Sequence, residues 1–141
     1  MEKSTFNELP KLLVNEGKKM RVNFDVEEST TEREVASTDK NGKDTTTTEK
    51  VTEYLAYVVR VAHPMSSDKV VSAIVEAAYP SDKMQAIINN HFVNLAVIAD
   101  GGTLDDDETR HETEYKAMQE WRTHAKSIAT DVMEAYNKGN Y

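Results

Sequence analysis

The sequence predicts an α+β fold in a single domain over residues 1–141, made of a long antiparallel β-hairpin and three helices. Over about 19–62, a strand of alternating apolar and polar residues and a second, more apolar strand lie on the two sides of Asn41-Gly42, which is typical of a hairpin with a tight turn. Further along, three segments carry apolar residues at three- and four-residue spacing behind capping residues, which predicts amphipathic helices. A chain of 141 residues can bury one such core.

The first segment, from Ser4 to Gly17, is predicted to be a short helix or turn. Pro10 suits a first helical position, Leu12 and Leu13 provide a small apolar edge, and Gly17 is a natural stop. We expect this segment to cover one end of the sheet.

The hairpin has a predicted register. A two-residue Asn-Gly turn needs positive φ at both positions, and it therefore fixes which residues face each other. Counting outward from Asn41-Gly42 predicts three facing pairs on one face of the sheet: Val26 with Tyr57, Phe24 with Val59, and Val22 with Val61. The second strand is apolar on both faces over residues 54–61, so helices are expected to pack on it.

Residues 28–50 are almost entirely polar, with Val35 and Ala36 as the only apolar side chains. Two interpretations stay open. The Thr-rich run 45–48 favours a projecting two-stranded β-arm, ordered mainly where a neighbour touches it. A mobile loop is the alternative, because an isolated two-stranded ribbon is marginal in water.

Three helices are predicted after the hairpin. Ser67-Asp68 and Ser81-Asp82 are typical helix starts and predict helices over 67–79 and 81–98, separated at Pro80. The acidic run 105–108 begins a third predicted helix over 105–137. At ~1.5 Å per residue this helix reaches on the order of 45 Å, more than a small domain readily covers. Part of its apolar stripe is therefore expected to face another subunit or another protein.

No catalytic, cofactor-binding or metal-binding residues are predicted, and the protein is not expected to be an enzyme. Gly101-Gly102 lacks the spaced glycines and Lys of a phosphate loop. The acidic residues 105–108 do not have the alternating spacing of a calcium loop. Glu108 and His111 have the Glu-x-x-His spacing of di-metal bundles, but the second copy that such a site needs is absent. A carboxylate metal enzyme would require Asp105 to converge with this pair and with further ligands.

The composition limits the partners. A formal net charge of −8 argues against nucleic acid, because affinity for phosphates depends on clustered Lys and Arg. No apolar run approaches the ~20 residues of a membrane span, so no membrane partner is expected. The chain contains no Cys, which fits a reducing compartment. We expect a protein that is cytoplasmic when made or, after assembly, part of a virion.

Candidate partner-binding residues lie at the hairpin tip, on the Thr-rich strand and on the last helix. Trp and Arg are enriched at interface hot spots, and the hairpin tip is the most exposed part of a projecting arm. The alternative for the Trp is a core anchor on its apolar stripe. The candidates are Asn41, Gly42, Thr46, Thr48, Trp121, Arg122 and Tyr136.

The stretch Glu-Tyr-Lys-Ala-Met-Gln-Glu-Trp-Arg at 114–122 resembles small accessory proteins of tailed bacteriophages, in which an acidic linker precedes a helix with a Tyr-to-Trp-Arg core. The resemblance covers residues 81–133 and does not include the hairpin. It implies a role in a virion or in its assembly, and it supplies no catalytic residue.

The function expected from these features is that of a non-enzymatic assembly or virion-associated structural module. It would act through protein contacts, as a homo-oligomer or beside a larger partner, because the polar arm and the long last helix exceed what a compact domain needs. The alternative is an acidic inhibitor that occupies a basic site on a host or defence protein. The acidic clusters 105–108 and 112–114 would steer such binding in a salt-sensitive way.

Overall fold

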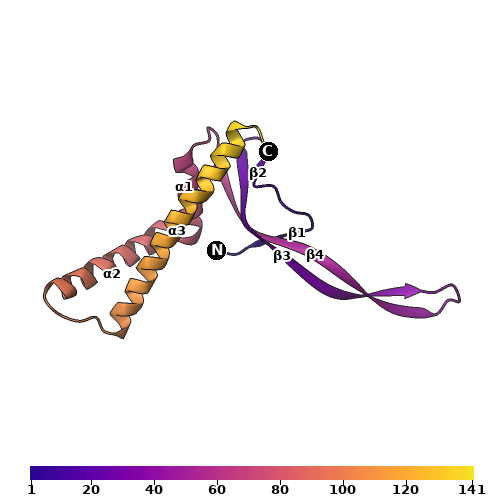
Figure 1. The fold of residues 1–141 in the computed structure, drawn as a ribbon, viewed down its shortest axis with the longest axis horizontal. Helices are drawn as coiled ribbons and strands as arrows, with labels where there is room; N and C mark the ends of the chain where they lie inside the picture. Colours follow the sequence, from indigo (N-terminus) through magenta and orange to yellow (C-terminus); the bar gives the residue numbers. More distant parts are fainter.

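The computed structural model describes residues 1–141 and has the predicted α+β fold. Its elements are β1 (Ser4–Phe6), β2 (Leu13–Asn15), β3 (Lys19–Thr38), β4 (Asp44–Ala62), α1 (Ser67–Ala78), α2 (Ser81–Ala99) and α3 (Asp106–Asn137). The strands form one antiparallel sheet in the order β1-β4-β3-β2. The molecule is elongated, with a β-ribbon projecting at one end and the α2–α3 helical hairpin at the other (Figure 1).

The predicted hairpin is present, but its predicted register is wrong. Its tip is a five-residue loop, residues 39–43, and not a two-residue turn. The Asp39 carboxylate accepts the backbone N–H groups of Asn41 and Lys43, both at 2.9 Å, and only Gly42 takes a positive φ, of 75°. This side-chain cap widens the loop and moves the pairing by one residue along the ribbon, where Thr38 faces Asp44.

A β-bulge then moves the register by one more residue. At the bulge, Asp25 and Val26 both lie opposite Ala56. Phe24 therefore faces Tyr57 and not Val59. Val22 faces Val59 in the same register. A shift of one residue moves a side chain to the other face of the sheet, and two such shifts return it to the first face. Val22 and Phe24 therefore still point into the core. Val26 is the exception: the bulge leaves it exposed.

The prediction of a helix or turn for the first segment, residues 4–17, is wrong. β1 pairs with β4 along one edge of the hairpin base, and β2 pairs with β3 along the other. Asn23 fixes the connection between them, because its side chain donates to the Lys11 carbonyl at 2.6 Å and its backbone N–H donates to the Leu12 carbonyl at 2.9 Å. The unpaired edges of β3 and β4 thus determine the conformation of this segment, since their backbone groups need partners.

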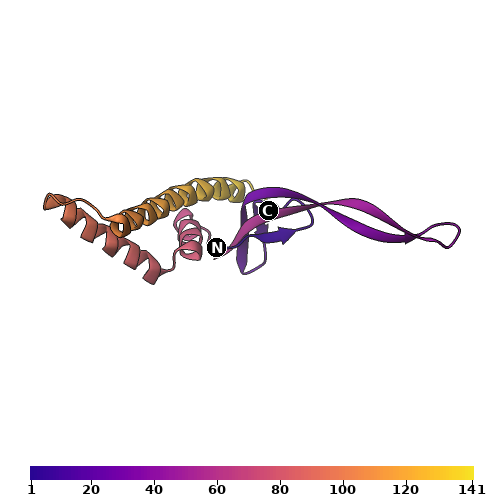
Figure 2. The ribbon, with the colours of Figure 1, turned by 90° about the horizontal axis from the view of Figure 1, so that it is seen from below.

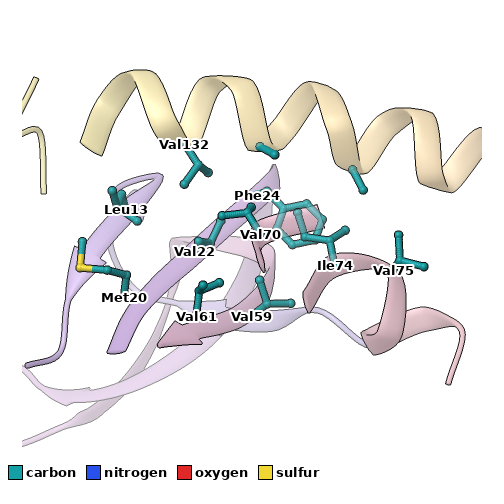
Figure 3. Close-up of a cluster of buried hydrophobic side chains, with 12 residues drawn as sticks. Leu13, Met20, Val22, Phe24, Val59, Val61, Val70, Ile74, Val75 and Val132 are labelled. Carbon is teal, nitrogen blue, oxygen red and sulfur yellow. The ribbon is translucent and has the colours of Figure 1, made fainter. Parts of the chain in front are cut away.

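The core lies in the middle of the molecule, between the base of the sheet, α1 and the C-terminal half of α3 (Figure 3). Only 17 of the 141 residues are buried, and none of these lies between residues 25 and 55. The central apolar cluster consists of Leu13, Met20, Val22, Phe24, Val59, Val61, Val70, Ile74, Val75, Ala125, Ala129 and Val132. The two projections therefore add almost nothing to the core that holds the fold together.

The three helices have the predicted positions to within one residue. The caps expected at Ser67 and Ser81 are each displaced by one residue, because Ser67 and Ser81 already lie within the helices and α2 begins after Pro80 without a side-chain cap. Ser66 caps α1, with its side chain accepting the Lys69 N–H at 3.3 Å. α3 begins with a complete capping box, in which Asp105 and Glu108 each accept the other's backbone N–H. α2 packs against the first half of α3, and the pair points away from the sheet, as Figure 2 shows from a second side.

Candidate protein-contact surfaces

One side of α2 is exposed and apolar. We call this surface, which lies away from α3, the outer face of α2; its residues are Phe92, Val93, Leu95, Ala96, Ile98 and Ala99. The exposed fractions are 61% for Phe92, 46% for Leu95 and 54% for Ile98. No Asp, Glu, Lys or Arg occurs from residue 84 to 99, although charged residues make up 30% of the chain. A large exposed apolar patch of this kind marks a contact site.

Over residues 92–99, the polarity of α2 is the reverse of that expected for a surface helix, whereas in its first half Ile87 is buried and Gln85 and Asn89 are exposed. Asn94 is the only polar residue in the run 92–99, and it is almost fully buried. Its side-chain amide donates to the Glu108 carbonyl at 2.8 Å, which ties α2 to the first turn of α3. A helix that lies on the surface of an isolated domain normally turns its apolar side inward. In the run 92–99, the one polar side chain is buried against the protein and most of the apolar ones are exposed.

A second polar contact fixes the same helical hairpin. The His91 ring stacks on Tyr115, with ring centroids 3.7 Å apart and planes within 4°. His91 Nδ1 also lies 2.9 Å from the Glu112 carboxylate. α2 and α3 are thus joined by specific contacts on one side, and this leaves the outer face of α2 available for another surface.

The second candidate surface is the projecting ribbon, which we call the arm and define as residues 28–54. The arm remains hydrogen-bonded up to Thr38 and Asp44, and none of its side chains is buried. β1 and β2 pair with the base of the hairpin and reach the arm only at Tyr54, which faces Phe6, so beyond this residue both long edges of the arm are unpaired. Unpaired strand edges can accept a strand from another chain.

Side-chain pairs across the arm are polar. Arg33 Nη2 lies 3.2 Å from Glu49 Oε2, and the hydroxyl oxygens of Ser37 and Thr45 are 2.9 Å apart. Such cross-strand pairs each contribute only a few tenths of a kcal/mol to about 1 kcal/mol. They support the ribbon without giving it a core.

The predicted partner-binding residues lie in three separate places. Asn41 and Gly42 are exposed at the tip of the arm, and Thr46 and Thr48 are exposed along β4. The other three candidates, on α3, are all only partly exposed: Trp121, Arg122 and Tyr136. The structure therefore brings together no single site from the predicted set.

Trp121 has the environment of a core anchor. Its indole N–H donates to the Ile74 carbonyl at 3.1 Å, and its ring contacts Phe24 and Tyr57, with centroids 6.2 and 5.7 Å away. Arg122 reaches the Met84 sulfur at 3.7 Å. Tyr136 packs on the core and stacks with Tyr141.

The prediction of an amphipathic helix over 81–98 missed the outer face of α2, because Phe92, Leu95 and Ile98 continue the three- and four-residue spacing of the buried Ile87. A signal was present in the sequence. The run from 92 to 99 is apolar at every position except 94, and a single side of a helix cannot bury residues that point in all directions.

The acidic residues around the start of α3 have local partners. Asp105 and Glu108 form the capping box, and Arg110 contacts both Asp107, at 2.6 Å, and Glu114, at 3.2 Å. The hydrogen bond from Arg110 lowers the pKa of the Asp107 carboxyl. His111 lies 4.0 Å from Asp107, and no group of three or more His, Asp or Glu side chains is arranged to hold a metal ion.

Comparison with protein-family models, with curated proteins and with solved structures finds no match to this chain. None of its helices is both long enough and apolar enough to cross a membrane.

Proposed function

We propose that this protein is a non-enzymatic assembly module that acts through protein contacts made by its two projections. The observation that carries the proposal is the exposed, uncharged outer face of α2 on a chain with net charge −8. Exposing apolar area to water costs ~25 cal/mol per Å² relative to burying it. A surface of this kind is stabilised when a partner covers it.

The arm supports the same function from the opposite end of the molecule. From Glu28 to Thr38 it extends ~35 Å at ~3.3 Å per residue, well beyond the core. Fixing the backbone costs ~1–2 kcal/mol per residue, and the arm has no buried side chains to offset that cost. Contacts with a neighbouring subunit would supply the missing stabilisation.

We propose that the protein is made in the cytoplasm and acts in a virion or in the assembly of one. Support for this setting comes from the resemblance of residues 81–133 to small accessory proteins of tailed bacteriophages. The elongated shape fits such a role, because contact sites at the two ends of a molecule can join different neighbours.

The alternative function, an acidic inhibitor of a basic protein, receives less support. Its steering carboxylates would be those near the start of α3, but Asp107 and Glu114 are paired with Arg110, and Glu112 contacts His91. A basic partner would have to displace these contacts. The outer face of α2 offers such a partner no charge at all.

The test removes the arm. Thr30 and Thr52 face each other, so residues 31–51 can be replaced by Asn-Gly to give a shortened hairpin. We expect the variant to fold, with a melting temperature within a few degrees of that of the parent, because none of the removed residues is buried. Light scattering at equal concentration should show that it forms smaller assemblies than the parent.

Circular dichroism of the same samples is the folding control. The proposal fails if the parent stays monomeric at every concentration tested. The alternative function, an acidic inhibitor, would be favoured by a second result. In that case the parent is monomeric and binds one basic protein, and added salt abolishes the binding.

A further inference from the structure

One edge of β4 is unpaired at the base of the hairpin. β1 pairs with β4 only as far as Ala56, so from Val58 to Ala62 this strand has β3 on one side and no strand on the other. None of the backbone hydrogen bonds outside the helices and strands involves these residues. Alternate N–H and C=O groups of an edge strand point away from its neighbour. An extended peptide chain is the ligand that matches such an edge.

The first helix makes this edge one side of a groove. α1 follows β4 in the chain and packs beside it (Figure 1). A shallow groove of about 340 Å³ lies between residues 60–62 of β4 and side chains from residues 68–76 of α1. Ser72 and Ala73, on the α1 side, are small and leave room for the backbone of an added strand. The groove therefore has the shape that β-strand addition requires.

The base of the hairpin is basic, although the chain as a whole is acidic. Residues 9–24 and 57–69, which include the groove edge, carry six Lys and Arg against two Asp and Glu. Two of these cations, Arg21 and Arg60, share the single carboxylate of Glu16. The net charge of −8 is thus unevenly distributed, and this part of the surface attracts acidic partners.

The arm has the opposite charge. Residues 28–54 carry seven Asp and Glu against four Lys and Arg. Glu28, Glu32 and Glu34 lie on one face of β3, because they are an even number of residues apart, and all three are exposed. None of the three forms an ion pair within the chain. The arm of one copy is therefore complementary in charge to the base of another.

The arm also fits the groove in shape. Pairing with β4 holds β3 of the arm extended, and its other edge is unpaired from Glu28 to Thr38. The arm reaches ~35 Å beyond the core, so it can lie against a neighbour without a collision between the two cores. An edge that needs a strand and a strand that needs a neighbour thus occur in the same chain.

We propose that the groove between β4 and α1 receives strand β3 of the arm of a second copy of this chain, which adds to the sheet beside residues 58–62. This inference rests on the proposed function and names the surface on which the arm docks. The contact joins two different surfaces, so each copy donates its arm to one neighbour and accepts the arm of another. Such a contact builds a filament or a closed ring.

The test fills the groove. Ser72 is exposed on the α1 side, and the indole of Ser72→Trp would occupy the space of the added strand. We expect the dissociation constant of self-assembly to rise at least ~10-fold, measured by sedimentation velocity. Ala77→Trp is the matched control, because Ala77 is exposed on the same helix but does not line the groove. This variant should assemble like the parent, and both should keep its circular dichroism spectrum.

A mixture identifies the occupant of the groove. Ser72→Trp keeps its arm but cannot accept one, and the variant in which Asn-Gly replaces residues 31–51 can accept an arm but has none to donate. Each should be monomeric alone at a concentration where the parent assembles. Mixed, they should form a complex with one copy of each. A symmetric contact between two arms predicts no complex in this mixture.

Charge exchange tests the complementarity. Lys19, which faces Ala62, and Lys69 of α1 are exposed beside the groove. Lys19→Glu/Lys69→Glu should weaken assembly ~10-fold, and so should Glu32→Lys/Glu34→Lys in the arm. Mixing these two double variants should restore assembly, because each altered surface then meets one of opposite charge.

The outcomes separate this inference from the proposed function. If Ser72→Trp leaves the oligomer intact but removal of the arm dissociates it, the arm docks elsewhere; the inference is wrong and the assembly module stands. If Ser72→Trp and the variant without the arm stay monomeric when mixed, the arm is not the occupant of the groove, which also overturns the inference. A parent that is monomeric throughout contradicts both.

Discussion

Single polar side chains determine the shape of this protein at points where apolar packing does not. Asp39 sets the width of the hairpin tip, and Asn94 decides which side of α2 faces α3. Asp25 lies in the bulge with a φ of 51°, a backbone conformation that glycine usually occupies there. Both oxygens of its carboxylate lie 2.8 Å from His124 Nε2, which connects the bulge to α3.

Replacing Asp25 separates the cost of this backbone conformation from that of the side-chain contact. Asp25→Ala and Asp25→Gly both lose the contact with His124, but only glycine takes a positive φ without a steric penalty. We expect Asp25→Ala to be less stable than Asp25→Gly by ~1 kcal/mol, measured as the free energy of unfolding in urea. Equal stability of the two variants would show that the bulge relaxes.

Glu16 predicts a pH dependence. Its carboxylate accepts hydrogen bonds from Arg60, at 2.8 Å, and from Arg21, at 3.0 Å, and the bond with Arg60 holds the pKa of Glu16 below its usual value. A lowered pKa in the folded state means that these ion pairs add stability at neutral pH. That contribution is lost as the pH falls through the lowered pKa.

We therefore expect Glu16→Gln to melt below the parent at pH 7, by a small amount because the pair is exposed. The difference should disappear in acid, where the carboxyl of the parent is protonated. Thermal unfolding of both proteins across the acidic range measures this. A difference that is constant with pH would mean that the substitution disturbs packing and not charge.

At the level of elements, local sequence signals predicted the helices and the existence of the hairpin well. The acidic run 105–108 begins α3 and Pro80 separates α1 from α2, and the chemistry of such residues acts on their nearest neighbours alone. The register and the strands β1 and β2 could not be predicted in the same way. They depend on the Asp39 cap, on the bulge and on the unpaired edges of the hairpin, and each of these needs a partner outside its own segment.

The α2–α3 hairpin should open as a local unit. Replacing Asn94 by Ala removes a buried hydrogen bond and should cost ~1–3 kcal/mol. Because this contact lies outside the central core, the loss should appear as faster amide hydrogen exchange in α2 and in the first half of α3. Exchange at the base of β3 and β4 should stay as slow as in the parent. Uniformly faster exchange would show that the hairpin and the core unfold together.

The whole molecule is a small central core with two extensions of opposite chemistry, one a polar ribbon and the other an apolar helical face. The sequence predicted that the polar arm and the last helix exceed what a compact domain needs. In the structure α3 contacts the core over its C-terminal half, and α2 is the helix with an uncovered apolar side. Neither the length of the arm nor the exposure of the outer face of α2 makes the isolated chain more stable.

The mass of the unaltered protein in solution is the most direct test of this interpretation. Light scattering coupled to gel filtration, from low micromolar to hundreds of micromolar protein, should give a mass of at least twice the 15.9 kDa of one chain, increasing with concentration. A mass of 15.9 kDa at every concentration would contradict it, because the arm would then have no second copy to contact.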